Sequence, residues 1–486
     1  MQILKIVQTK YNALSLPKKA AIWFAASSIM LKGVSFFTAP LFATLLSEYE
    51  FGKLSLFLSY EQIIVIFATW SSGLGAYRTG LFKYKDNIPS LTNAVLIFTN
   101  FLTIATFGLI FLFLNQFLDF TGFSVYSLLI AFAYIFTYPA YQCWVTKAKI
   151  EYNYQRVTVL TTLLTLVQTL LALLAVATIG AFADIKYIFM MIPAVLLDFV
   201  IFARTFSWKV VRENQSIIWK QIKFIAVFSF PLVFHSLSFF ILAQADRIMI
   251  GKMCGEAQAG IYSVAYTIAT ITQIIQNSVS EAFIPWLFRS LEQKDYDQIN
   301  KQFTRLLVLF GGVYLAFIMV APEVIILLYP DSYHAGIWCL PPIAIGTYFM
   351  FFYSVFVNIQ EYYGETRYIA LVSCVCALLN ILLNYFGIQY FGYTACAYTT
   401  LICYVLFAIG HYVFMRKVLR NKVNGIRIFT GRYLLLIAAV ILISMVVITI
   451  LYRYTLIRYL LMAIVLPVIV FVLYKYWVNR KTQGEI

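Results

Sequence analysis

The sequence predicts an all-α, polytopic membrane protein with about fourteen transmembrane helices, arranged as two parallel-repeat six-helix lobes plus two C-terminal helices. The first observation is composition: 62% of the 486 residues are hydrophobic and 12% are charged, whereas soluble domains are about 45–50% apolar and about 25% charged. The second is a series of apolar segments long enough to cross a bilayer. The third is an uneven distribution of Lys and Arg between alternate loops.

The first span is predicted at residues 21–46, and it carries Lys32 near its middle. About 20 apolar residues cross the ~30 Å hydrocarbon core. This segment is therefore long enough to span, and it is too long for the apolar core of a signal peptide. A cation at this depth costs at least ~2.5 kcal/mol. We expect Lys32 to face a watery cavity and bind a ligand, or else to snorkel or pair with a buried carboxylate; both interpretations stay open.

The remaining elements follow from the same hydropathy pattern. Residues 1–19 place four Lys among aliphatic residues, which predicts a short helix on the cytoplasmic membrane surface. After the first span, apolar segments predict thirteen more, at 54–77, 92–114, 125–146, 157–180, 187–206, 224–250, 258–287, 306–329, 337–359, 368–387, 395–415, 433–451 and 457–475.

The distribution of cations predicts the orientation of these spans. With an even number of helices, the two tails and every second loop lie on one side, and this side holds 29 of the 36 Lys and Arg residues. Cytoplasmic loops carry the excess of Lys and Arg, so both termini are expected in the cytoplasm. Apart from Lys32, the other cations fall on the opposite side, in loops or at helix ends: Lys53, Lys186, Arg247, Lys252, Arg453 and Arg458.

Two short patterns recur at nearly the same offset and indicate an internal duplication. ExxxGxxS occurs at 48–55 and 256–263, and YxxxR occurs at 152–156 and 363–367. Each pair occupies equivalent places in a six-helix period. Because six is even, the two lobes share one orientation, an arrangement that transporters use with their site between the repeats. We therefore expect lobes at 1–206 and 224–415, a cytoplasmic linker at 207–223, and a terminal helix pair and tail at 416–486.

Ionisable residues inside the spans are the candidate functional residues of the first lobe. Glu61 lies in the second span and Asp198 in the sixth, and each is either a structural partner of Lys32 or a ligand or coupling group. Arg78 follows the second span at its cytoplasmic mouth. For Arg78 an ordinary anchoring role is favoured over substrate binding.

The seventh span contains Pro231, His235, Gln244, Asp246 and Arg247. Adjacent residues of a helix point about 100° apart, so Asp246 and Arg247 cannot simply neutralise each other, and each needs another partner. Arginine is suited to a phosphate, because its planar fork binds such groups with two hydrogen bonds. His235 could titrate near neutral pH, but a hydrogen-bonded core role is favoured.

Polar side chains in the eighth span recur three to four residues apart, at Gln273, Gln276, Asn277 and Glu281. Such spacing places them on one stripe. The stripe either lines a cavity or joins helices, and the pair of asparagines in the eleventh span, at 380 and 384, supports the same two interpretations.

Several function classes are excluded or disfavoured. No Walker loop GxxxxGK[ST] occurs, and no hydrophilic connection is long enough for a soluble catalytic domain, so we expect no enzymatic activity. The seven cysteines are scattered without CxxC pairs, which predicts neither a metal site nor a disulfide framework. The net charge of +16 is expected to reflect cytoplasmic loops and attraction to membrane lipids rather than a nucleic-acid partner.

The segments LKGVSFFTAPLFATLLSEYEFGKLSLFLSYEQ, QADRIMIGKMCGEAQAGIYSVAYTIA and EAFIPWLF resemble the Wzx-type oligosaccharide flippases. These proteins belong to the multidrug/oligosaccharidyl-lipid/polysaccharide exporter superfamily. The resemblance implies that a polyprenyl-pyrophosphate-linked oligosaccharide moves from the inner to the outer leaflet of the bacterial cytoplasmic membrane, by alternating access through a cationic cavity. It also implies that Lys32 and the Asp246-Arg247 pair face that cavity, and that other membrane proteins of polysaccharide assembly are partners.

Other functions remain as alternatives. A cation-coupled multidrug exporter of the same superfamily would need an acidic pocket, whereas the deepest charge here is a lysine, which favours an anionic substrate. A polysaccharide polymerase or ligase would need a larger outer loop than this chain contains. The sequence leaves the coupling ion, Na⁺ or H⁺, and the sugar structure undetermined.

Overall fold

The computed structural model describes residues 16–73, 75–151, 153–464 and 467, and every regular element among them is a helix. Most of the predicted surface helix and the end of the last predicted span lie outside these residues. The chain divides into two compact units, Met1–Phe240 and Ile241–Ile486. We call them the first and the second unit.

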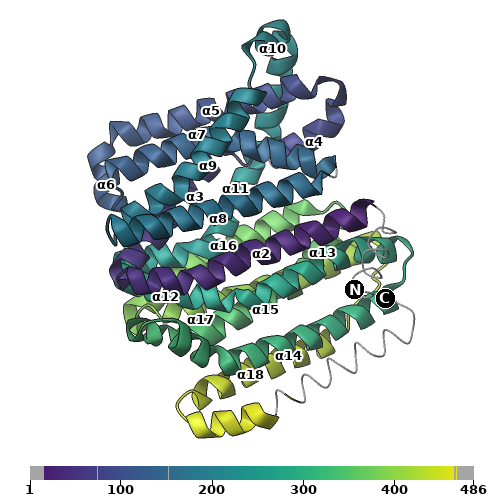
Figure 1. Cartoon of the computed structure of the whole chain (residues 1–486). Helices are drawn as coiled ribbons and strands as arrows, with labels where there is room; N and C mark the ends of the chain where they lie inside the picture. Colours follow the sequence, from purple (N-terminus) through teal and green to yellow (C-terminus); the bar gives the residue numbers. More distant parts are fainter. Residues whose placement is uncertain (1–15, 74, 152, 465–466, 468–486) are drawn as a thin grey trace, which may run out of the picture. The chain divides into compact units, whose positions relative to one another are not determined.

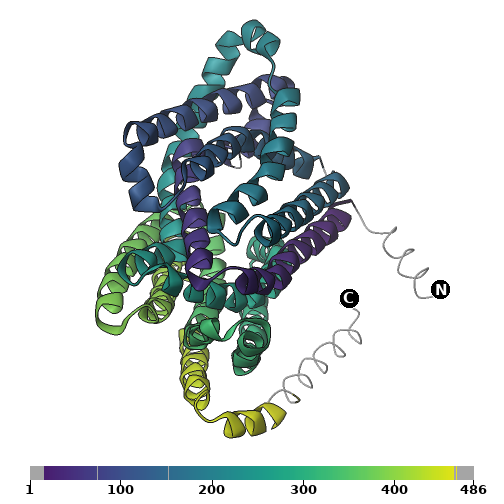
Figure 2. The ribbon, with the colours of Figure 1, turned by 60° about the vertical axis from the view of Figure 1, so that its left-hand side comes forward.

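Among the described residues, the first unit contains nine α-helices and one 3-10 helix, followed by the start of a tenth α-helix. Its elements are α2 (Leu16–Leu45), α3 (Glu48–Thr69), α4 (Gly75–Lys83), η1 (Lys85–Asn87), α5 (Ile88–Leu112), α6 (Leu114–Thr121), α7 (Val125–Ile150), α8 (Tyr154–Thr178), α9 (Ala183–Thr205), α10 (Trp208–Glu213) and the first part of α11 (Gln215–Met253). Helix α2 packs along α8, and Figures 1 and 2 both show the purple and blue helices side by side.

The second unit continues α11 and adds the remaining helices. They are α12 (Glu256–Ala269), α13 (Ile271–Glu292), α14 (Tyr296–Leu328), η2 (Asp331–Cys339), α15 (Leu340–Tyr362), α16 (Thr366–Phe391), α17 (Ala395–Lys422) and α18 (Gly431–Leu451), with a short apolar helix at Thr455–Ile464. Within the described residues, eleven helices are long and apolar enough to cross a membrane. The protein is a multi-pass membrane protein with an all-α fold, as the sequence predicts.

Two predicted spans are broken in the structure. The second ends at Thr69, after which Trp70 and Ser71 adopt a left-handed backbone, with φ of 49° and 52°. The chain then passes α7 so closely that a Cβ on Gly73 would lie 2.6 Å from the side-chain oxygen of Gln142. The eighth predicted span is divided at Thr270, between α12 and α13. Hydropathy is averaged over a window, so it does not register a break of a few residues.

The division between the two units falls inside α11, which begins in the first unit and continues into the second. The first part of α11 packs into the first unit, where Ile218 and Ile225 join a buried cluster with residues of α4 and α5. It is also hydrogen-bonded to the turn after α3, through Ser72 to Ser229 at 3.2 Å. The predicted linker is itself largely helical, as α10 and the first turns of α11. These contacts hold the first part of α11 to the first unit.

The internal duplication is reflected in helix packing. In the first unit, α3 contacts α5, α5 contacts α7, and both α7 and α8 contact α9; Figure 1 shows α5, α7 and α9 side by side. In the second unit, α13 contacts α14, α14 contacts α15, and both α15 and α16 contact α17. Helices with the same place in the two repeats therefore pack in the same order. This agrees with the two six-helix lobes that the recurring patterns predict.

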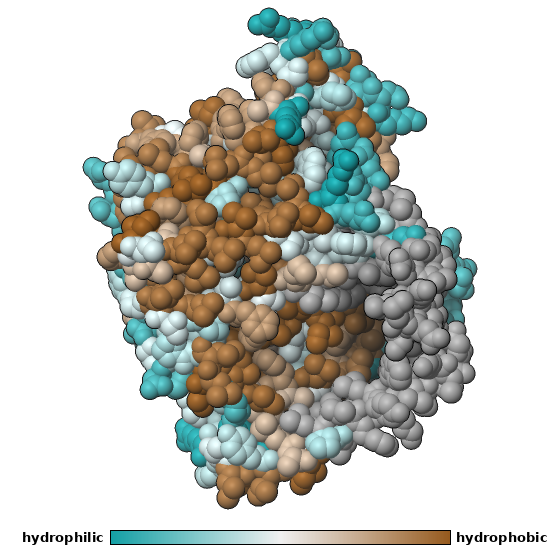
Figure 3. Space-filling view, viewed as in Figure 1, coloured by the Kyte–Doolittle hydropathy of each residue, from teal (hydrophilic) through white to brown (hydrophobic). Residues whose placement is uncertain are grey.

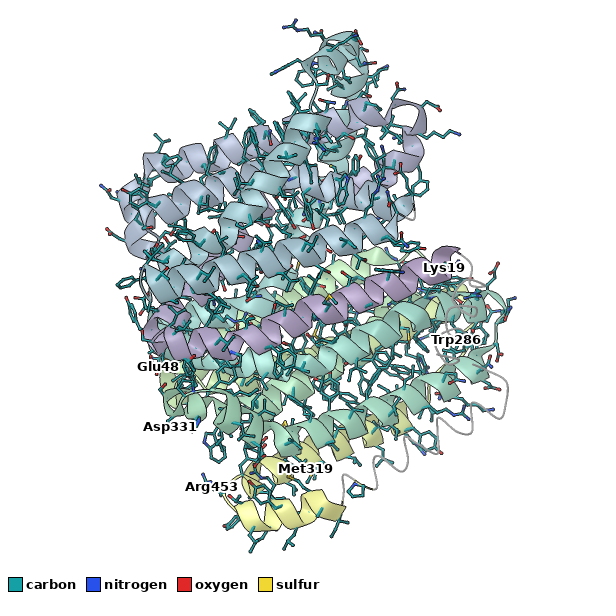
Figure 4. All side chains as sticks on the ribbon, in the orientation of Figure 1. Lys19, Glu48, Trp286, Met319, Asp331 and Arg453 are labelled. Atoms are coloured by element: carbon teal, nitrogen blue, oxygen red, sulfur yellow. The ribbon has the colours of Figure 1, made fainter. Side chains whose placement is uncertain are left out.

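The outer flanks of the helices suit a lipid environment. Large apolar side chains are exposed along them, among them Phe101, Leu170 and Leu382, and Figure 3 shows hydrophobic side chains over the helix flanks and hydrophilic ones around α10. Figure 4 places Lys19 and Glu48 near opposite ends of α2. In the second unit, the same figure places Asp331 and Arg453 at one end of the helices and Trp286 toward the other end.

We predict that the loop around Glu213 is cytoplasmic and that Asp331 lies on the opposite side of the membrane, because the cation count places them there. Both side chains are exposed. Cysteines introduced singly at these positions, in a background with Cys254 and Cys374 replaced by serine, should react with a membrane-impermeant thiol reagent from opposite sides. Labelling of both from the same side would contradict the topology.

Candidate functional site

Glu61 of α3 is a buried carboxyl in the first unit, with 7% of its surface exposed. It accepts a 2.5 Å hydrogen bond from the hydroxyl of Tyr187 in α9. A buried polar group needs such a partner, because losing water without a hydrogen bond costs about 1–3 kcal/mol in proteins. No ion pair joins Glu61 to Lys32 among the described residues. In the described residues the structural partner of Glu61 is therefore Tyr187 and not Lys32.

Asp198 of α9 is buried more deeply, with 1% exposed. Its Oδ1 atom has no hydrogen-bond partner among the described residues. Three tyrosines of α7, at 134, 138 and 141, lie close enough to interact with this carboxyl electrostatically. An unpartnered carboxyl oxygen in an apolar interior is suited to hold a proton or a small cation.

Lys32 and Arg78 differ from these carboxyls in being exposed. Lys32 lies in α2, which packs on α8, and no ion pair or hydrogen bond of its side chain is found in the described part of the chain. A Cβ added at Gly33 would meet nothing within 4 Å. Arg78 lies in the short helix α4 and likewise has no ion pair among the described residues. The structure shows no contact between these two cations.

Asp246 and Arg247 of α11 each have a separate partner in the second unit. Asp246 is 1% exposed; it accepts a 2.5 Å hydrogen bond from Tyr262 of α12 and a bond from the backbone N–H of Arg247. The Arg247 guanidinium donates to the side chain of Gln244 and lies 4.3 Å from the centre of the Tyr266 ring. Adjacent charges that point in different directions need separate partners, which agrees with the expectation from helix geometry.

The sequence places Arg247 near the outer end of the seventh span, and in the structure it lies inside α11 with 7% exposed. Lys186 and Arg458, which the sequence also places on the outer side, are buried as well. The Lys186 ammonium lies 3.5 Å from the centre of the Phe42 ring, and Arg458 forms an ion pair with Glu323 of α14. The hydropathy of the sequence near a helix end could not reveal that these side chains are buried, because their burial depends on which helices pack there.

Two residues of the polar stripe, Gln273 and Gln276, contact neighbouring helices, whereas Asn277 is exposed. Gln276 of α13 accepts a 2.8 Å hydrogen bond from Tyr314 of α14. Asn380 of α16 donates to Thr400 of α17, and Asn384 accepts from Thr399. The side chains of His235 and Glu281, the other two candidates, lie outside the described residues.

This architecture is shared by a superfamily of membrane transporters. The chain superposes on "Lipid II flippase MurJ, inward closed conformation" with a TM-score of 0.62 at 13% identity, covering 94% of this chain and 99% of that one. It superposes on an inward-facing multidrug resistance transporter of the MOP superfamily with a TM-score of 0.58 at 14% identity, covering 83% of this chain and 96% of that one. At such identities the likeness concerns the fold.

Sequence comparison identifies the family. A model described as "Polysaccharide biosynthesis protein" matches residues 18–291, and one described as "MatE" matches residues 231–386. The chain belongs to the polysaccharide biosynthesis protein family and has the fold of the superfamily that its segments resemble.

The chain also has individual relatives, each with low sequence identity. The chain is 26% identical to "Lsg locus putative protein 1" of Haemophilus influenzae, over 32% of this chain and 40% of that protein. It is 25% identical to "Uncharacterized membrane protein" of the same organism, over 76% of this chain and 89% of that protein. The match therefore spans less than half of the first relative and most of the second.

We predict that Tyr262→Phe lowers the free energy of unfolding by about 1–3 kcal/mol, because the carboxyl of Asp246 loses its buried hydroxyl donor. Thermal unfolding of the purified protein in detergent measures the change. Tyr390→Phe is the matched control, since Tyr390 is exposed on α16 of the same unit. Equal stability of the two variants would contradict the assigned hydrogen bond.

Proposed function

We propose that the protein moves a polyprenyl-pyrophosphate-linked oligosaccharide from the cytoplasmic to the outer leaflet of the bacterial cytoplasmic membrane, by alternating access and without chemical change to the substrate. The observation that carries this proposal is the match of residues 18–291 to the polysaccharide biosynthesis family. The fold it shares with a lipid II flippase over 94% of the chain supports it. Both termini are cytoplasmic in this proposal, and other membrane proteins of polysaccharide assembly are partners.

The charges of the described residues favour an anionic substrate. Lys32 and Arg78 are exposed and have no acidic partner in the described part of the chain, so their charge is available to a ligand. Glu61 and Asp198 are buried, and less than a tenth of the surface of each residue is exposed. Their carboxyls therefore add little negative charge at the protein surface. A pyrophosphate is attracted by such cations, and arginine can bind it with two hydrogen bonds.

The proposed substrate-binding residues are Lys32, Arg78, Asp246 and Arg247. The lobes at 1–206 and 224–415 carry them, and 416–486 forms an added pair of helices. Glu61, Asp198, His235 and Glu281 are the proposed groups for pairing or for coupling to Na⁺ or H⁺. Asp198 is the foremost of these, because its Oδ1 has no hydrogen-bond partner among the described residues.

A cation-coupled multidrug exporter is the second candidate, supported by the match of residues 231–386 to the MatE model. One experiment separates the two. Mass spectrometry of lipid extracts should show a polyprenyl-pyrophosphate oligosaccharide accumulating when the protein is removed from its cell. Unchanged lipid-linked sugars together with new sensitivity to cationic drugs would favour the exporter.

Lys32→Ala should abolish transport while the protein keeps its normal abundance, because Lys32 has no ion pair among the described residues whose loss would destabilise the fold. Lys32→Arg should keep partial transport, since the charge remains. Complementation of a strain lacking the protein measures transport, and immunoblotting of membranes measures abundance. Lys85→Ala, which removes an exposed cation elsewhere in the first unit, is the control. Full complementation by Lys32→Ala would remove Lys32 from the site.

Arg247→Lys should impair transport at least tenfold although the charge is kept. A lysine supplies a point charge in place of the planar fork that contacts Gln244 and stacks on Tyr266. Arg212→Lys, at an exposed position of α10, should behave as wild type. Thermal unfolding of both variants separates a binding defect from loss of stability. Wild-type transport by Arg247→Lys would reduce Arg247 to a structural residue.

A further inference from the structure

A basic cavity lies where α17 ends and the chain turns toward α18. Its volume is about 630 Å³, and it is lined by Arg416, Lys417, Arg420, Asn424, Gly425 and Arg427. Four of these six residues are cations and none is acidic. The substrate residues proposed above do not include any of them, and both family models match segments that end before residue 416.

The charges of this basic cavity are not neutralised within the described residues. In the part of the chain that the structure describes, no ion pair involves Arg416, Arg420 or Arg427. Glu365, at the start of α16, is already bound by Arg367 at 3.1 Å and by Lys422 at 3.4 Å. Cations that line one cavity repel each other, so their convergence is favourable where an anion fills the space between them.

The backbone brings the last of these cations into place. Asn424 and Gly425 both have positive φ, of 52° and 80°. The N–H of Gly425 donates to the carbonyl of Leu419 at 3.2 Å, which caps the end of α17 and reverses the chain. Arg427 follows this turn and lines the same cavity as Arg416 and Arg420. The basic cavity is therefore a product of the fold and not only of a basic sequence.

An apolar stripe leads along α17 to the arginines. Ile402, Leu406, Ile409 and Val413 are exposed large apolar residues of this membrane-spanning helix. Their spacing of four, three and four residues places them on one face, and three and seven residues after Val413 the same face presents Arg416 and Arg420. A fatty-acid chain that lies along this stripe would place its headgroup at the arginines.

We propose that the basic cavity binds the phosphodiester headgroup of an anionic phospholipid, with an acyl chain along the apolar stripe of α17. The headgroup phosphate accepts paired hydrogen bonds from the guanidinium groups of Arg416, Arg420 and Arg427. Basic pockets at the ends of transmembrane helices recognise anionic lipid headgroups by this chemistry. The site shares no residue with the proposed transport site, so it can be tested whether or not the protein is a flippase.

The experiment is native mass spectrometry of the full-length protein in detergent, titrated with phosphatidylglycerol, with phosphatidylcholine, or with inorganic phosphate. The wild type should bind phosphatidylglycerol at least tenfold more tightly than phosphatidylcholine. The triple variant Arg416→Gln/Arg420→Gln/Arg427→Gln should lose that preference. The control Lys85→Gln/Lys209→Gln/Arg212→Gln removes the same charge from exposed positions of the first unit and should keep it.

If the control variant lost the preference for phosphatidylglycerol equally, net charge alone would attract the lipid. This result would overturn the proposed site. Displacement of phosphatidylglycerol by equimolar inorganic phosphate would assign the cavity to a soluble anion and overturn the lipid proposal. If the triple variant does not fold, Arg420→Gln alone still decides the matter, because Arg420 is exposed and has no ion pair among the described residues. An unchanged lipid preference in that variant would also contradict the proposal.

Discussion

The burial of charged groups in helices that cross a membrane is the constraint on which this structure depends. Water is absent from the bilayer core, so each buried charge needs a partner supplied by the protein. In both units a tyrosine hydroxyl serves a carboxyl: Tyr187 for Glu61 and Tyr262 for Asp246. These bonds link α9 to α3 and α12 to α11, so the same contacts that satisfy the charges also join the helices of each unit.

Some of the groups with a proposed function lack such a partner. Lys32 and Arg78 have no ion pair among the described residues, and the Oδ1 atom of Asp198 has no hydrogen-bond partner there. Partnered groups such as Lys186 and Arg458 account for packing. The exposed cations on α2 and α4, which have no ion pair among the described residues, carry the proposed attraction for a pyrophosphate.

The sequence could predict the helical class, the approximate spans and the duplication, because hydropathy and recurring short patterns can be read directly from the sequence. It also predicted that Asp246 and Arg247 need separate partners, because that follows from helix geometry alone. It could not predict the break at Trp70 and Ser71, or the burial of Lys186 against Phe42 and of Arg458 against Glu323. Those features depend on which helices come together, and the residues concerned resemble ordinary loop or helix-end residues in the sequence.

The most direct test of the proposed transport is reconstitution of the purified protein into vesicles that contain a polyprenyl-pyrophosphate oligosaccharide in both leaflets. A membrane-impermeant enzyme that cleaves sugars from the outer leaflet reports how much substrate becomes accessible over time. If the protein moves this lipid, nearly all of the substrate should become accessible with the wild type, and only about half with Lys32→Ala. Half accessibility with the wild type, in vesicles in which the protein is folded, would contradict it.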